Sequence, residues 1–243
     1  MRNLNILLFL LIATTFILLG FLFSQFTGKA VYQLEKANLT RIIDGDTIDT
    51  SLGKIRLLGI NTPEKKEAGF QEAANFLVQF QGKEVELERT NEDKDKYGRL
   101  LRYVFYQGKL INEEILTRGL AHFYSYNDDK YTTRLKNAEE KAQKAELGIW
   151  EKSKNNCTKC INLVKLNPVD PGEYVLLKNT CNFNCNLQNW FIKDDASNKK
   201  ILNFSLLQGK EIQLNYSGRV WNDAGDSFYL RDDSGLLVVF YRY

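Results

Sequence analysis

Residues 54–64 read KIRLLGINTPE, and this stretch decides the fold of the first half of the chain. Residues 55–58 are apolar except for Arg56, as in a strand that keeps one polar side chain toward solvent. A glycine and the corner Thr62-Pro63-Glu64 follow, and glycine and proline commonly end a strand in a turn. The stretch therefore predicts a β-strand that leads directly into a polar corner.

Strand-like runs lie on both sides of this stretch, with turn-forming clusters between them. With the stretch itself, they cover residues 39–43, 47–50, 54–58, 84–88 and 100–106. Apolar residues at helical spacing predict helices over residues 67–80, 111–116 and 132–147. For residues 37–152 this order predicts a small closed barrel of five strands with three helices packed against it, which is the OB architecture.

The second half of the chain has a different pattern. Residues 153–159 are polar and predict a linker, after which the helical spacing disappears. Strand-like runs then recur at regular spacing over residues 161–164, 174–177, 190–192, 211–214, 227–230 and 236–241. This pattern predicts a β-sandwich over residues 160–243, so that the whole chain is a β-rich α+β protein.

The N-terminus predicts export. Residues 6–23 form an apolar run without a polar face, which disfavours a buried core helix. The run of about 18 residues is just long enough to cross a bilayer. We expect residues 1–23 to be a retained signal anchor rather than a cleaved signal peptide, because Phe21 and Phe23 crowd the place of a small-residue cleavage site. Residues 24–36 then form a polar stalk, and both alternatives place the body outside the cytoplasm, membrane-anchored or secreted.

The charge balance permits a nucleic-acid partner without arguing for one. The net charge of the 243-residue chain is only +3. Basic binding surfaces are usually local, so a small overall excess decides little.

Four cysteines form two close pairs in the second half, namely Cys157, Cys160, Cys181 and Cys185. Two such pairs about twenty residues apart resemble a four-thiolate zinc ribbon. The oxidising exterior favours disulfides instead, and free thiols are the third alternative. A bridge between the pairs, for example from Cys160 to Cys181, would join two neighbouring strands.

Polar residues of the first half combine into a set with chemical meaning. Asp46 lies at a turn, Arg56 in a strand, Glu64 at a corner and Arg99 at the start of a later strand. Cleavage of a phosphodiester needs a carboxylate that orients water and guanidinium groups that neutralise the phosphate. A hard divalent cation held by oxygen ligands polarises the phosphoryl group. His122, the only histidine, has no place in this chemistry, and we expect a structural or surface position for it.

The strings IDGDT, IRLLGINTPE, DKYGR and ELGIW occur in this order along the chain. Together they resemble the staphylococcal nuclease (thermonuclease) family over about residues 37–150. The resemblance implies that Asp46 and the backbone carbonyl of Thr62 hold calcium. It implies that Arg56 and Arg99 hold the scissile phosphate and that Glu64 activates or positions the water. The tyrosines that it places around the nucleotide pocket are Tyr97, Tyr124 and Tyr126.

One position departs from that family. Asn61 stands where the family usually has aspartate. An amide oxygen can still ligate calcium but brings no charge, so we expect a weakened metal site with Asn61 among its ligands. The identity and affinity of the divalent cation are therefore left open.

The second half resembles another family. The strings GEYVLLKN, LQNWFIKD, FSLLQG and WNDAGDSFYLRD resemble a lamin-tail domain over about residues 160–243. The resemblance implies an immunoglobulin-like sandwich with a non-catalytic role in binding or positioning. We expect Trp190 and Trp221 to anchor its core rather than to stack on bases.

The sequence as a whole predicts an exported, membrane-anchored endonuclease and exonuclease that cleaves DNA and RNA, preferably single-stranded, with calcium as cofactor. We expect a monomer that contacts the membrane through its N-terminal helix. The rival interpretation is a catalytically silent protein that binds nucleic acid or serves in surface adhesion.

Overall fold

The computed structural model describes residues 15, 34–124, 128–196, 198–222 and 225–243. The predicted anchor and most of the predicted stalk lie outside these residues, and both stay predictions. Within the described ranges, no helix is long and apolar enough to span a membrane. The chain divides into residues 1–34 and 35–243, and every contact given below lies within the second unit.

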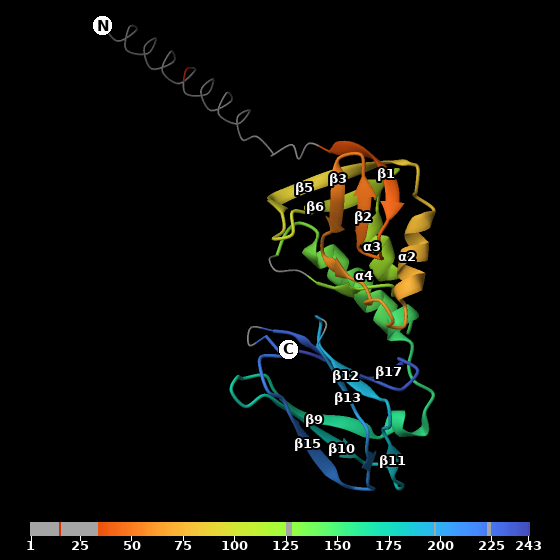
Figure 1. Ribbon diagram of the computed structural model, residues 1–243, viewed down its shortest axis with the longest axis vertical. Helices are drawn as coiled ribbons and strands as arrows, with labels where there is room; N and C mark the ends of the chain where they lie inside the picture. The colour runs from red at the N-terminus through yellow and green to blue at the C-terminus, as the bar shows by residue number, and fades with distance from the viewer. Residues whose placement is uncertain (1–14, 16–33, 125–127, 197, 223–224) are drawn as a thin grey trace, which may run out of the picture. The chain divides into compact units, whose positions relative to one another are not determined.

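Five strands of the first half close into a barrel. They are β1 (Glu35–Ile42), β2 (Thr47–Thr50), β3 (Gly53–Leu57), β5 (Glu84–Lys94) and β6 (Leu100–Tyr106). Neighbours pair antiparallel in the order β3-β2-β1-β5-β6, and a parallel pairing of β3 with β6 closes the ring. A short strand, β7 (Lys109–Leu110), extends the sheet beside β6. Figure 1 shows these strands grouped into one body, with α2 along its flank. The predicted five-stranded barrel is confirmed.

The barrel begins two residues earlier than the expected start at residue 37. Glu35 pairs with Leu87 across β1 and β5. Its carboxylate also lies 3.1 Å from the guanidinium of Arg102, a side chain only 3% exposed. Arg102 also lies 2.8 Å from Asp93, so Glu35 at the start of β1 is one of two carboxylates that contact this buried cation, a contact that strand periodicity does not reveal.

Three helices accompany the barrel, as predicted. They are α2 (Phe70–Val78), α3 (Ile111–Thr117) and α4 (Thr132–Lys144), and a 3-10 turn, η1 (Gly148–Trp150), follows α4. Helix α2 is shorter than the expected 67–80, because Lys66 and Gly69 take left-handed backbone conformations with φ of 78° and 92°. The described barrel core includes buried side chains from all three helices, Leu77, Ile115 and Leu135 among them.

A close backbone crossing fixes the end of this half. Gly119 has a φ of 66°, and a Cβ atom there would lie 2.1 Å from the carbonyl oxygen of Leu147. The amide of Ile149 donates to the carbonyl of Gly119 over 2.8 Å. The crossing sets Trp150 into a buried position, 1% exposed.

The second half consists of two antiparallel sheets that share a core. One sheet contains β9 (Ile161–Asn167), β10 (Tyr174–Asn179) and β15 (Glu211–Asn215). The other contains β12 (Phe191–Lys193), β13 (Lys199–Ile201), β16 (Ser227–Arg231) and β17 (Leu237–Arg242), and Figure 1 shows the two layers. A two-stranded ladder joins β11 (Cys185–Asn186) to β14 (Ser205–Leu206). We call residues 160–243 the sandwich. Trp190 and Trp221 are both 1% exposed in its core, which confirms them as core anchors.

The expected linker is ordered by hydrogen bonds. Lys152 forms a bridge with Leu237, and the amide of Ser153 donates to the carbonyl of Leu237 over 2.9 Å. A short 3-10 helix, η2, covers Asn156–Lys159. Residues 152–159 are therefore ordered beside β17 and do not form an unstructured linker.

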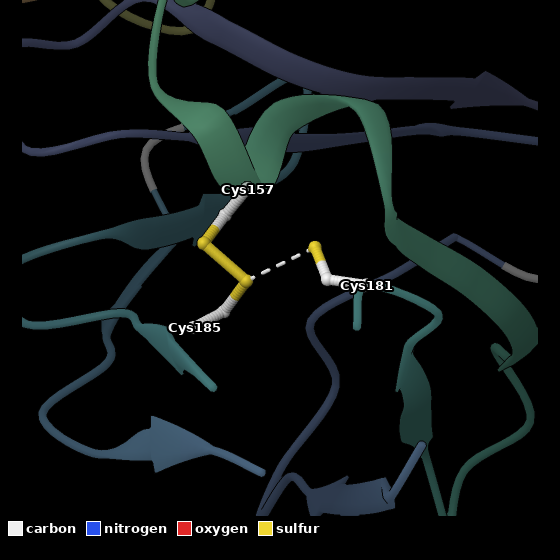
Figure 2. Close-up of side chains that lie close together, drawn as sticks. All are labelled: Cys157, Cys181 and Cys185. Atoms are coloured by element: carbon white, nitrogen blue, oxygen red, sulfur yellow. Dashed lines mark hydrogen bonds between the residues drawn. A yellow bond between two sulfur atoms is a disulfide. The ribbon is translucent and has the colours of Figure 1, made fainter. Parts of the chain in front are cut away.

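Disulfides join this 3-10 helix and the residue after it to β11 and to the bend that follows β10. Cys157 bonds to Cys185 and Cys160 bonds to Cys181. The sulfur atoms of Cys181 and Cys185 lie 3.4 Å apart, and Figure 2 shows the sulfurs of Cys157, Cys181 and Cys185 gathered in one place. The bridges close loops of 28 and 21 residues and tie the end of the linker to the sandwich.

Candidate active site

The turn between β1 and β2 places the first carboxylates. Gly45 in this turn has no room for a side chain, since a Cβ atom would lie 2.5 Å from that of Ala73. The turn is thus pressed against α2, and Asp46 is only 7% exposed. One of its oxygens, Oδ2, accepts from the amide of Thr62 at 2.9 Å and from its hydroxyl at 3.1 Å. Asp46 and Thr62 therefore lie together, although the sequence separates them by sixteen residues.

Arg56 of β3 connects this carboxylate to the corner that follows β3. Its Nε lies 3.4 Å from Oδ1 of Asp46, and its side chain is 14% exposed. Its Nη1 donates to the carbonyl of Leu57 at 2.5 Å and its Nη2 donates to Oδ1 of Asn61 at 3.2 Å. The guanidinium is therefore held in one orientation by three neighbours. It remains partly open to solvent.

Arg99, the residue before β6, is linked to Asp46 through the hydroxyl of Thr47. Its Nε donates to Oδ2 of Asp95 at 2.6 Å, and its Nη1 donates to the hydroxyl of Thr47 at 3.4 Å. That hydroxyl in turn donates to Oδ1 of Asp46 at 3.1 Å. Burial raises the pKa of Asp95, but hydrogen bonds from Arg99 outweigh this and leave the pKa below its usual value. Asp95 therefore stays ionised and holds the arginine.

Tyr97 stands beside Arg99. Its ring is 72% exposed, and the guanidinium carbon of Arg99 lies 5.5 Å from the ring centroid. Tyr124 is half-buried and follows β8 (His122–Phe123), which pairs with β4 (Ile60–Asn61). The structure thus places Tyr124 next to the corner of Asn61. Tyr126 lies outside the described residues.

Glu64 projects from the corner after Thr62 and is exposed. Its amide donates to Oε2 of Glu67 at 3.0 Å, which fixes the backbone of the corner. Glu67 is itself held, because its Oε2 lies 2.8 Å from Nζ of Lys193 in the sandwich. Burial raises the pKa of Glu67, but the charge and hydrogen bond of the Lys193 ammonium outweigh this effect. The pKa of Glu67 is therefore lower than its usual value.

The oxygens around Asp46 suit a hard divalent cation. Asp44, which sequence reasoning did not assign to the site, accepts from the amide of Asp46 through its Oδ1 at 3.0 Å. Burial, and then the charge of Asp46, raise the pKa of Asp44. The charge of Asp46 thus disfavours the ionisation of Asp44, and a cation beside the two carboxylates would relieve this repulsion. The only sequence signal for Asp44 was its place two residues before Asp46 in the same turn.

Three other oxygens near Asp46 are possible ligands of a cation. Oδ1 of Asn61 is a neutral ligand of the kind that calcium accepts, but it already takes a hydrogen bond from Arg56. The backbone carbonyl of Thr62 lies one residue further on, and the hydroxyl of Thr47 touches Asp46. The carboxylates of Asp44 and Asp46 could therefore hold a hard divalent cation, whereas Oδ1 of Asn61 is engaged with Arg56.

Comparison with known proteins gives a consistent result. A family model described as staphylococcal nuclease homologue matches residues 54–152. The chain is 38% identical to a thermonuclease of Staphylococcus intermedius over 125 residues, which cover 46% of this chain and 74% of that protein. It is 36% identical to the endonuclease YncB of Bacillus subtilis over 52% of this chain and 66% of that protein. An uncharacterized endonuclease of Haemophilus influenzae is 32% identical over 65% of this chain and 84% of that protein.

These similarities are consistent with the barrel and with the polar residues that follow β3. The matched family segment includes Arg56, Glu64 and Arg99. The chain therefore belongs to the staphylococcal nuclease family.

Proposed function

We propose that this chain is a nuclease that hydrolyses phosphodiester bonds of DNA and RNA with a divalent cation, calcium. One observation carries the proposal. Two arginines, Arg56 and Arg99, are connected to the buried carboxylate of Asp46, Arg56 directly and Arg99 through the hydroxyl of Thr47. Guanidinium donors beside oxygen ligands are what a phosphate and a cation need at one place.

The two arginines suit the charged transition state. Asp46 and Asp95 hold them before substrate arrives, so no reorganisation is needed as negative charge develops on the phosphate. Both side chains keep an exposed edge, 14% and 27% of their surface, through which phosphate oxygens can accept hydrogen bonds. This arrangement stabilises the transition state more than the ground state.

Glu64 is the group we assign to the attacking water. Its carboxylate is exposed at the corner, within the same short loop as Thr62. In this position it orients the water and accepts its proton as the water attacks phosphorus, and the bond to the 5′ oxygen breaks. A cation bound at Asp46 would polarise the phosphoryl group. Tyr97 and Tyr124 flank the site and suit stacking on the bases of a single strand.

The surroundings of the enzyme are also part of the proposal. The apolar run of residues 6–23 favours a single-pass anchor that holds the protein outside the cytoplasm as a monomer. The resemblance of residues 160–243 to a lamin-tail domain supports a non-catalytic role for the sandwich. We propose both disulfides for the oxidising exterior.

The rival function is a silent barrel that binds nucleic acid without cleaving it. The retention of Asp46, Arg56, Glu64 and Arg99 speaks against it, since catalytic side chains have no use in a binding module.

Cleavage of single-stranded DNA and RNA by the full chain in detergent, with calcium and with chelator, tests the proposal. Glu64→Ser should abolish calcium-dependent cleavage. Glu72→Ser is the matched control, because Glu72 is an exposed glutamate at the start of α2 and should leave cleavage unchanged. Tight binding of the strands without cleavage under any divalent cation would instead establish the silent barrel.

A further inference from the structure

Asn61 bonds on two sides, to the barrel and to the sandwich. Its Oδ1 accepts from Nη2 of Arg56 at 3.2 Å, and its Nδ2 donates to the backbone carbonyl of Asp195 at 2.8 Å. The amide thus uses its acceptor toward one half of the chain and its donor toward the other. It connects the guanidinium of Arg56 to the sandwich backbone through one side chain.

The carbonyl that Asn61 meets is itself held in place. The carboxylate of Asp195 accepts from the hydroxyl of Tyr229 at 2.6 Å and from that of Ser227 at 2.8 Å. Its amide donates to Oδ1 of Asp226 at 3.2 Å. The carboxylate of Asp195 is therefore occupied within the sandwich. The group that Asp195 offers to Asn61 is its backbone carbonyl oxygen, which is a hydrogen-bond acceptor.

Further contacts keep the sandwich against the barrel around this bond. Lys193 pairs with Glu67 at 2.8 Å, and both side chains are largely buried, 8% and 17% exposed. Trp150 packs with Tyr229, Leu237 and Phe240 in one buried cluster. These contacts join the sandwich to the barrel and give the bond from Asn61 a fixed partner.

The same bond explains why this position carries an amide. An aspartate could still accept from Arg56, but its ionised carboxylate has no proton to donate to the carbonyl of Asp195. Two acceptors would then face each other at the separation of a hydrogen bond, which is unfavourable in a half-buried place. An asparagine satisfies both neighbours at once.

We infer that Asn61 is a positioning residue through which the sandwich fixes the orientation of Arg56 for phosphate binding. The inference rests on the proposed function as far as the phosphate is concerned. The sandwich is accordingly a working part of the nuclease site, and Asn61 acts chiefly as a donor to the sandwich rather than as a calcium ligand.

The docking bond is tested by hydrogen exchange on the full chain. Asn61→Asp should speed amide exchange in residues 193–196 and 226–231 at neutral pH. Asn75→Asp, the same change at an exposed position of α2, should alter neither segment. Unchanged exchange in Asn61→Asp would refute the bond, whether or not the protein cleaves nucleic acid.

The effect on Arg56 is tested with an uncharged variant. Asn61→Leu removes both hydrogen bonds at similar size, and Asn75→Leu is its control. We expect Asn61→Leu to weaken binding of a phosphorothioate-linked thymidine octamer in chelator by about five- to tenfold, the equivalent of one hydrogen bond. Equal binding by the two variants, with a wild type that binds and cleaves, would overturn the positioning role. A wild type that neither binds nor cleaves would instead refute the proposed function.

An opposite result for the charged variant would also decide the matter. If Asn61→Asp tightened calcium binding and raised cleavage while exchange in the sandwich stayed unchanged, Asn61 would be a metal ligand and the inference would be wrong.

Discussion

Replacing Arg242 with methionine should destabilise the chain, because it leaves a buried carboxylate without its cation. Nη1 and Nη2 of Arg242 donate to the two oxygens of Glu139 at 2.5 and 3.1 Å. Glu139 lies in α4 and its side chain is 2% exposed, whereas that of Arg242 is 32% exposed. The remaining donor to Glu139 that the described structure shows is the amide of Phe123, at 2.8 Å.

The size of the loss follows from this geometry. Breaking a buried ion pair from one side costs about 3–5 kcal/mol. The third of Arg242 that solvent reaches lets water replace part of the lost contact, so we expect about 2–3 kcal/mol. In a protein of this size that is a fall of about 5–10 °C in the midpoint of thermal unfolding.

Urea denaturation and calorimetry of the wild type and Arg242→Met measure the difference. The double variant Arg242→Met with Glu139→Gln should recover about 1–2 kcal/mol, because glutamine still accepts from Phe123 and buries no charge. Lys178→Met is the control, since its pair with Glu211 is 42% exposed on both sides. A loss below about 0.5 kcal/mol for Arg242→Met, the level of an exposed pair, would refute the reasoning.

Four further predictions follow from the site and the fold. Arg99→Ala should slow cleavage by about a hundred- to a thousandfold without lowering the thermal midpoint; activity within a few-fold of wild type would remove Arg99 from the phosphate site. In urea denaturation, Gly119→Ala should lower the free energy of unfolding by about 3 kcal/mol or more, because its Cβ would lie 2.1 Å from the carbonyl oxygen of Leu147. Gly108→Ala, with open space around it, should lower it by only about 1 kcal/mol. Burial raises the pKa of Asp194 from 3.8 to about 6, so the folded state prefers the protonated acid and the free energy of unfolding should fall by about 2 kcal/mol as pH rises from 4 to 6; a flat profile would contradict this. Thiol titration of the unreduced protein should find no free cysteine, and metal analysis should find no zinc; one zinc per chain would favour the four-thiolate site instead.

The barrel could be predicted because its signals are local. The strand over residues 100–106 and the helix start at Ile111 were correct as predicted, since strand periodicity and turn residues act over a few neighbours. The position of α2 was less accurate, because left-handed conformations at Lys66 and Gly69 depend on packing that the sequence does not display.

The residues of the candidate site that belong to a sequence motif could be predicted. Contacts to the site from a distant part of the chain could not. Arg56, Asp46 and Thr62 lie together in the structure, and the roles that the resemblance implies for them stay predictions. The contact of Asn61 with Asp195 joins residues 134 positions apart, and no local pattern announces such a pair. His122 shows the same limit: the sequence indicated a structural or surface position, and the structure buries it, 4% exposed, beside Trp150 and Tyr229.

The pairing of Arg242 with Glu139 also imposes an order in time. The two residues are 103 positions apart, so a ribosome that adds about 5–20 residues per second delivers Arg242 about 5–20 s after Glu139. Asp195 emerges well after Asn61 for the same reason. During this interval the nascent barrel has Arg56 and Asn61 but lacks the carbonyl of Asp195 to which Asn61 donates. The pair that buries Glu139 therefore forms only once β17 has been made, and synthesis itself separates the making of the barrel from the completion of its contacts with the sandwich.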